Sequence, residues 1–167
     1  MKKIKVLTSI ALIGSMLLAM TGCGTKVNYI EKKEFKKLLK NELDMEEDED
    51  FYVYNYNEYD RISAYYGDVT IRAAWYDDED DAYDEFEDMY DEVADGIEDG
   101  DFKGDSKLDI QDTTGYIMVN GKMDGDYAYG GIYFCDNMIV QVSTESKRDR
   151  AIEGVNEVLD VLGLPSL

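Results

Sequence analysis

The chain has 167 residues, of which 38 are acidic and 17 basic, so its formal net charge at pH 7 is −21. A chain this acidic repels the phosphate backbone, which excludes nucleic-acid binding. It contains no histidine, and therefore lacks the usual general base and the most common metal ligand. The charge is also unevenly spread. Residues 23–41 carry six lysines and two glutamates, whereas residues 42–109 carry 27 acidic and four basic residues.

The first residues of the chain have the parts of a secretory signal. Three lysines within residues 1–5 precede a mostly apolar run over residues 6–20, which is short for a bilayer span of about 20 residues. The sequence Met-Thr-Gly-Cys begins at the last residue of this run and ends at Cys23. This motif resembles the lipobox of bacterial lipoproteins, with methionine in place of the commoner leucine.

The resemblance implies cleavage between Gly22 and Cys23 and a covalent diacylglyceryl group on Cys23, whose two acyl chains would give stable anchoring. We therefore expect residues 1–22 to be a signal peptide, residues 23–28 a lipidated polar tether, and residues 29–167 one domain at the extracytoplasmic face of the cell membrane. The alternatives are an uncleaved signal anchor and a cleavage site without lipid. Removal of the signal would leave 145 residues, enough for a genuine core, and would move the net charge from −21 to −24.

Hydrophobic periodicity predicts three helices, over residues 29–43, 77–99 and 147–162, with residues 44–50 as an acidic loop after the first. Asn28 is a candidate N-cap of the first helix, and Asp77 or Asp78 of the second. Gly163 fits the left-handed position at the end of the third helix.

Alternating and short apolar runs predict six strands, over residues 51–57, 61–66, 69–76, 114–120, 127–135 and 138–144. Residues 100–112 and 121–126 are expected to be a loop and a turn. This order predicts a single α+β domain in which an antiparallel sheet of about five to six strands is packed by amphipathic helices on one face. The repeated strand-helix blocks hint at a duplicated unit, although the two halves share little sequence. The closing pattern of polar turn, apolar strand and helix ending in Leu-Gly resembles small uncharacterised lipoproteins of Gram-positive bacteria, a resemblance that implies no activity.

Two of the predicted helices are strongly charged. The first carries Lys32, Lys33, Lys36, Lys37 and Lys40. It could lie against anionic lipid headgroups, although simple packing as an amphipathic helix is the favoured interpretation. The second helix contains acidic pairs four residues apart, each unfavourable by roughly 0.2–0.5 kcal/mol.

The acidic helix offers a candidate face for a divalent cation or a basic partner, formed by Asp80, Asp84, Asp88 and Asp91. The simpler interpretation is a solvated face that promotes solubility. Stretches that begin at Asp99 and Asn120 resemble calcium loops only in their first residues and lack the required ligands. The sequence therefore predicts no metal site and no cofactor other than the covalent lipid.

Tyrosines gather on two predicted strands: Tyr52, Tyr54 and Tyr56 on the first, and Tyr127, Tyr129 and Tyr133 on another. The first group is a candidate ligand face that could stack on a cell-wall glycan or grip an extended peptide. Alternatively, such tyrosines cover a half-exposed sheet or lie under a helix. Cys135 is expected to be a buried small hydrophobe, with an intermolecular disulfide as the lesser alternative.

No catalytic constellation is apparent, so no catalytic residue is predicted. We expect a non-enzymatic, monomeric, lipid-anchored surface domain that presents an acidic and tyrosine-rich face to a cell-wall glycan or a surface protein. The alternatives are a low-affinity divalent-cation-binding accessory protein and a small hydrolase that uses paired carboxylates.

Overall fold

The computed structural model describes residues 26–123 and 125–167. The expected signal peptide over residues 1–22 and the expected lipidation site at Cys23 lie outside the described residues. The described elements, in chain order, are α1 (Lys32–Glu42), β1 (Phe51–Asn55), β2 (Tyr59–Tyr66), β3 (Val69–Tyr76), α2 (Glu79–Glu98), β4 (Phe102–Gln111), β5 (Thr114–Met123), β6 (Asp126–Cys135), β7 (Met138–Thr144) and α3 (Asp149–Leu162). Of the helices in this part of the chain, none has the length and apolar character needed to span a bilayer.

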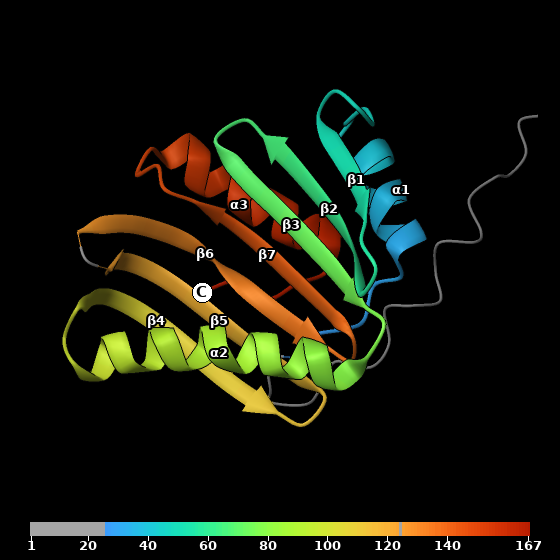
Figure 1. Cartoon of the computed structure of the whole chain (residues 1–167). Coiled ribbons are helices and arrows are strands. Elements are labelled where there is room, and N and C mark those ends of the chain that lie inside the picture. The colour runs from blue at the N-terminus through green and yellow to red at the C-terminus, as the bar shows by residue number, and fades with distance from the viewer. Residues whose placement is uncertain (1–25, 124) are drawn as a thin grey trace, which may run out of the picture.

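The seven strands form one antiparallel sheet in the order β1-β2-β3-β7-β6-β5-β4 (Figure 1). β1 to β3 form one meander and β4 to β7 another. The two meanders meet where β3 pairs with β7, with Ile71 opposite Val142. The expected α+β class with an antiparallel sheet is confirmed, whereas the expectation of five to six strands is too low.

The strand missing from the prediction is β4, which occupies most of the expected loop over residues 100–112. β4 is an edge strand whose Leu108 and Ile110 pack in the core beneath α2. Its alternate residues include Lys103 and Lys107, which are exposed. Because charged and glycine residues interrupt the apolar alternation, the strand pattern is hidden in the sequence. β5 likewise runs three residues further than predicted, into the expected turn.

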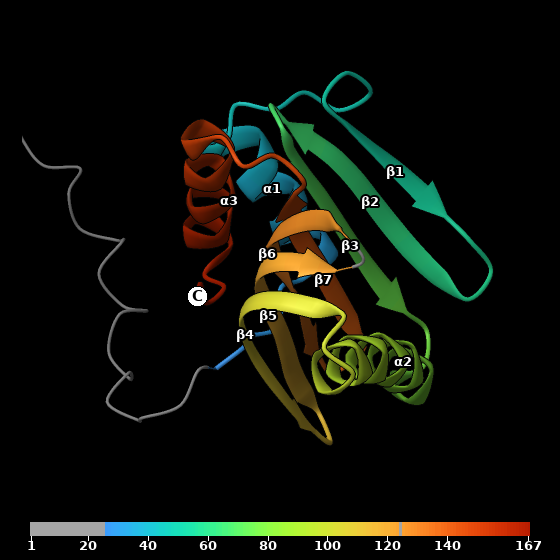
Figure 2. The ribbon, with the colours of Figure 1, turned by 90° about the vertical axis from the view of Figure 1, so that its left-hand side faces the viewer.

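Helices cover both faces of the sheet, contrary to the expectation that they lie on one face. α1 and α3 lie on one side, whereas α2 crosses the other (Figure 2). The reason lies in strands β6 and β7, which carry apolar side chains on both of their faces. Tyr133 and Val140 belong to the core under α1 and α3, while their neighbours Phe134 and Ile139 belong to the core under α2.

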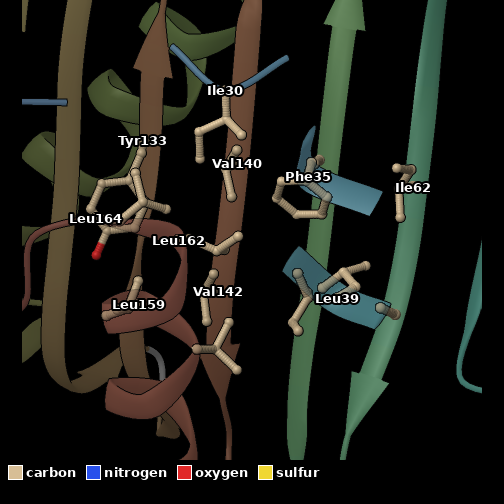
Figure 3. Close-up of a cluster of buried hydrophobic side chains, with 14 of the residues drawn as sticks. Ile30, Phe35, Leu39, Ile62, Tyr133, Val140, Val142, Leu159, Leu162 and Leu164 are labelled. Atoms are coloured by element: carbon tan, nitrogen blue, oxygen red, sulfur yellow. The ribbon is translucent and has the colours of Figure 1, made fainter. Parts of the chain in front are cut away.

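The larger core lies between the sheet and the helices α1 and α3 (Figure 3). Phe35 and Leu39 of α1 are fully buried against it, and Leu159 of α3 is 2% exposed. In the smaller core, the ring of Phe86 on α2 stacks on Phe134 with centroids 5.3 Å apart. A glycine of the sheet lies beneath this ring and leaves space for it. A Cβ atom at Gly115 would lie only 2.6 Å from Cε1 of Phe86.

α1 begins later than predicted. Its N-cap is Glu31 and not Asn28, and the preceding residues are not helical. Val27 and Ile30 are buried at 2% and 8% exposure, and the indole nitrogen of Trp75 donates a 2.9 Å hydrogen bond to the carbonyl oxygen of Ile30. The expected polar tether therefore does not extend to residue 28, because the chain is already packed in the domain at Val27.

The predicted N-cap of α2 and the predicted C-terminal end of α3 are confirmed. The side chain of Asp78 accepts a hydrogen bond from the backbone N–H of Asp80 at 2.9 Å, which caps α2. Gly163 has a φ angle of 66° and ends α3 in the left-handed conformation. Leu164 then folds back and is buried in the larger core.

Candidate functional site

One half of the sheet has a face that none of the described helices covers. α2 packs on β3 to β7, and β1 and β2 extend beyond it (Figures 1 and 2). The strand register places ten residues of β1 to β3 on this side of the sheet, and we call them, together with Tyr56, the open face. The ten are Tyr52, Tyr54, Tyr59, Arg61, Ser63, Tyr65, Thr70, Arg72, Ala74 and Tyr76.

The predicted ligand residues lie on the open face. Tyr52, Tyr54 and Tyr56 are exposed at 39%, 39% and 46%. The first two project from β1, and the third follows directly after the strand ends. The structure therefore leaves these three side chains accessible to a ligand.

Four tyrosines form a continuous row of stacked rings across the open face. The centroid distance is 6.2 Å between Tyr54 and Tyr56, 4.8 Å between Tyr56 and Tyr59, and 5.3 Å between Tyr59 and Tyr76. The interplanar angles are 21° to 30°. The rings are thus close to parallel, and the row offers a ligand aromatic surface together with hydroxyl groups.

The second group of predicted tyrosines lies on the opposite side of the sheet. Tyr129 and Tyr133 are buried, and Tyr127 packs against the same core. The hydroxyl of Tyr133 donates a 2.6 Å hydrogen bond to the carbonyl oxygen of Pro165, and the hydroxyl of Tyr129 bonds to Oδ1 of Asn156 at 2.8 Å. For this group, the interpretation as tyrosines beneath a helix is correct.

Arg61 lies within the tyrosine row. Its guanidinium carbon is 5.1 Å from the ring centroid of Tyr54 and 5.4 Å from that of Tyr56, and Nη2 donates a 3.1 Å hydrogen bond to the hydroxyl of Tyr56. Its Nε is shielded from solvent and has no hydrogen-bond partner among the described residues. A buried donor left unpaired costs about 1–3 kcal/mol.

The open face carries a second arginine, Arg72, on the neighbouring strand. None of the ion pairs formed within the described part of the chain includes Arg61 or Arg72. Sequence reasoning missed both residues. The available signal was their isolation, because they are the only basic residues between Lys40 and Lys103.

A groove of about 260 Å³ separates the open face from α2. Both arginines line it from the sheet, and Glu85 of α2 lines it as well. Aliphatic side chains make up another part of its wall: Met89, Ile132 and Ile139. Sites for drug-sized ligands span about 300–1,000 Å³, so this groove suits a single side chain or a chain end.

The hydroxyl of Tyr76 lies beside this groove. Burial, followed by the charge of Glu85, raises the pKa of Tyr76 to about 12, although Arg61 acts in the opposite direction. The hydroxyl therefore stays protonated at neutral pH. It can donate a hydrogen bond to an anionic ligand but cannot act as a base there.

The candidate acidic face of α2 is dispersed. Asp80, Asp84, Asp88 and Asp91 are all exposed along the helix. Within residues 26–123 and 125–167, no group of three or more carboxylates or thiols is arranged to hold a metal ion. The structure thus does not bring these four carboxylates together.

Four of the five lysines of α1 form ion pairs with acidic neighbours. Lys32 pairs with Asp60 at 2.7 Å, and Lys36 and Lys40 pair with Glu47 at 2.7 and 2.9 Å. Hydrogen bonds from the last two lysines lower the pKa of Glu47. The helix packs on the domain through its apolar side, as the favoured interpretation of its sequence predicts.

Cys135 is buried, as expected. Burial and the adjacent Asp136 raise the pKa of its thiol to about 11, which keeps it protonated and unreactive at neutral pH.

Comparison of the chain with models of protein families, with curated proteins and with solved structures finds no match in any of the three.

Proposed function

We propose that this protein is a lipid-anchored domain on the outer face of the cell membrane that binds a ligand through the open face and does not catalyse a reaction. The observation that carries the binding role is the uncovered half of the sheet, where stacked tyrosines surround an arginine without an acidic partner in the described chain. Tyrosine and arginine are enriched at binding surfaces because each combines apolar contact with hydrogen bonding.

The chemistry of these side chains supports binding over catalysis. Arginine is always charged and cannot act as a base. Tyr76, with its pKa raised to about 12, holds its proton at neutral pH. A surface made of such groups can recognise a ligand through hydrogen bonds and stacking, and neither the arginines nor Tyr76 would exchange protons with it at neutral pH.

The proposed anchor rests on the lipobox-like motif that ends at Cys23. We expect the full-length chain, expressed in a Gram-positive host, to be processed and recovered with the membrane. A Cys23→Ser variant should accumulate as the unprocessed precursor and should not incorporate a labelled fatty acid. Identical processing, labelling and membrane association of the two proteins would overturn this placement.

The proposed binding face is tested with isolated cell envelopes, which contain both wall glycan and surface proteins. We expect detergent-solubilised full-length protein to co-sediment with them and the double variant Tyr54→Ala/Tyr56→Ala to lose most of this binding. Tyr29→Ala is the matched control, because Tyr29 has similar exposure, 37%, but precedes α1 and is not part of the open face. Equal sedimentation of the double variant and the wild type would contradict the proposal.

A further inference from the structure

The two arginines of the open face lie on neighbouring strands and line the same groove. Arg61 lies opposite Ala74 in the sheet, and Arg72 is two residues from that position on the same strand. Such diagonal neighbours on adjacent strands lie about 7–8 Å apart, within reach of long side chains. Both arginines are among the residues that line the groove beside α2. Planar guanidinium donors match the geometry of a carboxylate.

The remaining wall of the groove indicates which kind of side chain belongs to the ligand that carries this anion. Ile132 and Ile139 of the sheet and Met89 of α2 present aliphatic surface. Aliphatic surface favours an apolar side chain in contact with it. The volume of about 260 Å³ is large enough for one residue.

Glu85, on the α2 side of the groove, adds a hydrogen-bond acceptor. A ligand that carries an N–H donor as well as a carboxylate would satisfy both Glu85 and the arginines. The last residue of a peptide has this combination, since its amide N–H and its terminal carboxylate flank one side chain.

The overall charge of the chain further restricts the ligand. With a net charge of −21, the protein repels polyanions at long range, so an acidic polymer would be disfavoured at the groove. A ligand with a single carboxylate experiences much less of this repulsion while still meeting two arginines at close range.

We propose that the groove binds the free C-terminus of a peptide whose last residue has an apolar side chain. The terminal carboxylate lies against Arg61 and Arg72, the side chain lies on Ile132 and Ile139, and the last amide N–H points toward Glu85. This inference rests on the proposed function, because it names the class of ligand that the open face receives.

The experiment compares two peptides that differ only at their end. Full-length protein in detergent micelles is titrated calorimetrically with acetyl-Gly-Ala-Leu as the free acid and as the carboxamide. We expect the acid to bind at least roughly tenfold more tightly, because the carboxamide has no charge to pair with the arginines. Arg61→Gln and Arg72→Gln should each remove this preference.

Arg150→Gln is the matched control, since it removes the same charge from an exposed arginine on α3, on the other side of the sheet. It should leave the preference unchanged. Circular dichroism verifies that each variant is folded, and Arg61→Lys supplies a second variant that keeps the charge but not the planar fork. It should bind the acid more weakly than the wild type.

Equal affinity for the two peptides, an unchanged preference in Arg61→Gln, or tighter binding of inorganic phosphate or glucuronate would each overturn the proposal. The absence of any binding up to about 10 mM peptide would overturn it as well. None of these results depends on the co-sedimentation of the Tyr54→Ala/Tyr56→Ala variant with cell envelopes. Failure of the carboxylate ligand and failure of the open face as a binding surface are therefore distinguishable.

Discussion

The indole Nε1 of Trp75 on β3 donates a 2.9 Å hydrogen bond to the backbone carbonyl oxygen of Ile30, in the segment that precedes α1. Both residues are buried, and the ring of Phe35 from α1 meets the indole edge-on at a centroid distance of 5.4 Å. The carbonyl of Ile30 is thus bonded to the sheet and not to the next turn of a helix. This explains why α1 begins at Lys32, three residues later than the sequence predicts.

Trp75→Phe is expected to lower the free energy of unfolding by about 1–3 kcal/mol, because it leaves the buried carbonyl of Ile30 without its donor. Urea denaturation monitored by circular dichroism measures the change. Tyr65→Phe is the control, since Tyr65 is 58% exposed, and it should shift the free energy by less than about 0.5 kcal/mol. Unfolding of Trp75→Phe at the wild-type urea concentration would show that this bond does not stabilise the domain.

Asp78→Ala is expected to destabilise the protein by about 1 kcal/mol through loss of the N-cap of α2. Asp77→Ala removes the same charge from the neighbouring exposed position, which is not the N-cap. The difference between the two midpoints of denaturation therefore isolates the capping bond from the change in charge. If the two variants unfold together, the cap contributes nothing beyond charge.

Stability is expected to decline in alkaline solution. Burial raises the pKa of Cys135 from 9.0 to about 11 and that of Tyr76 from 10.0 to about 12. Because the folded state holds these protons more tightly than the unfolded state, their contribution is complete below pH 9 and is lost as the pH rises through 11 to 12. Denaturation curves across this interval measure the decline.

Tyr76→Phe removes one of the two groups and should make the alkaline loss of stability shallower. A matched comparison is Tyr65→Phe, whose exposed hydroxyl should leave the pH dependence as it is in the wild type. A stability that stays constant up to pH 11 would contradict the prediction, because it would show that neither Tyr76 nor Cys135 is buried as described.

Salt is expected to stabilise the domain by screening the acidic pairs of α2. Asp84 has acidic neighbours four residues away on both sides, Asp80 and Asp88, so Asp84→Asn should raise the stability by a few tenths of a kcal/mol. Sodium chloride and calcium chloride of equal ionic strength should raise the melting temperature equally. A markedly larger effect of calcium would favour the cation-binding alternative and contradict simple screening.

The sequence predicted best those elements whose apolar pattern is uninterrupted. β3 and β7 have the predicted bounds, and α3 begins two residues late and ends where expected. In contrast, the sequence predicts a loop where β4 lies, because the exposed side of this strand carries lysines and aspartates and because Gly104 breaks the pattern. β4 is an edge strand, and the apolar side that it buries can be recognised only from its contact with α2, which the sequence does not show.

The candidate site was predictable only strand by strand. Alternation along one run placed Tyr52, Tyr54 and Tyr56 together, since side chains two residues apart share a face. Their association with Arg61 and Arg72 depends on which strands pair and in what register, which no local pattern specifies. The groove further depends on the path of α2 across the sheet. Its position followed from packing on both faces, whereas the sequence predicted packing on one.

The attachment of Ile30 to the sheet determines how a force from the proposed anchor would act on the domain. Its carbonyl is bonded to Trp75 on β3, and its backbone N–H lies 3.4 Å from the Sδ atom of Met138 on β7. These two strands are neighbours at the middle of the sheet. If the N-terminal side were anchored, tension applied near residue 26 would be transmitted to two strands that each pair with a neighbour on both sides. The force would therefore not first separate an edge strand from the sheet.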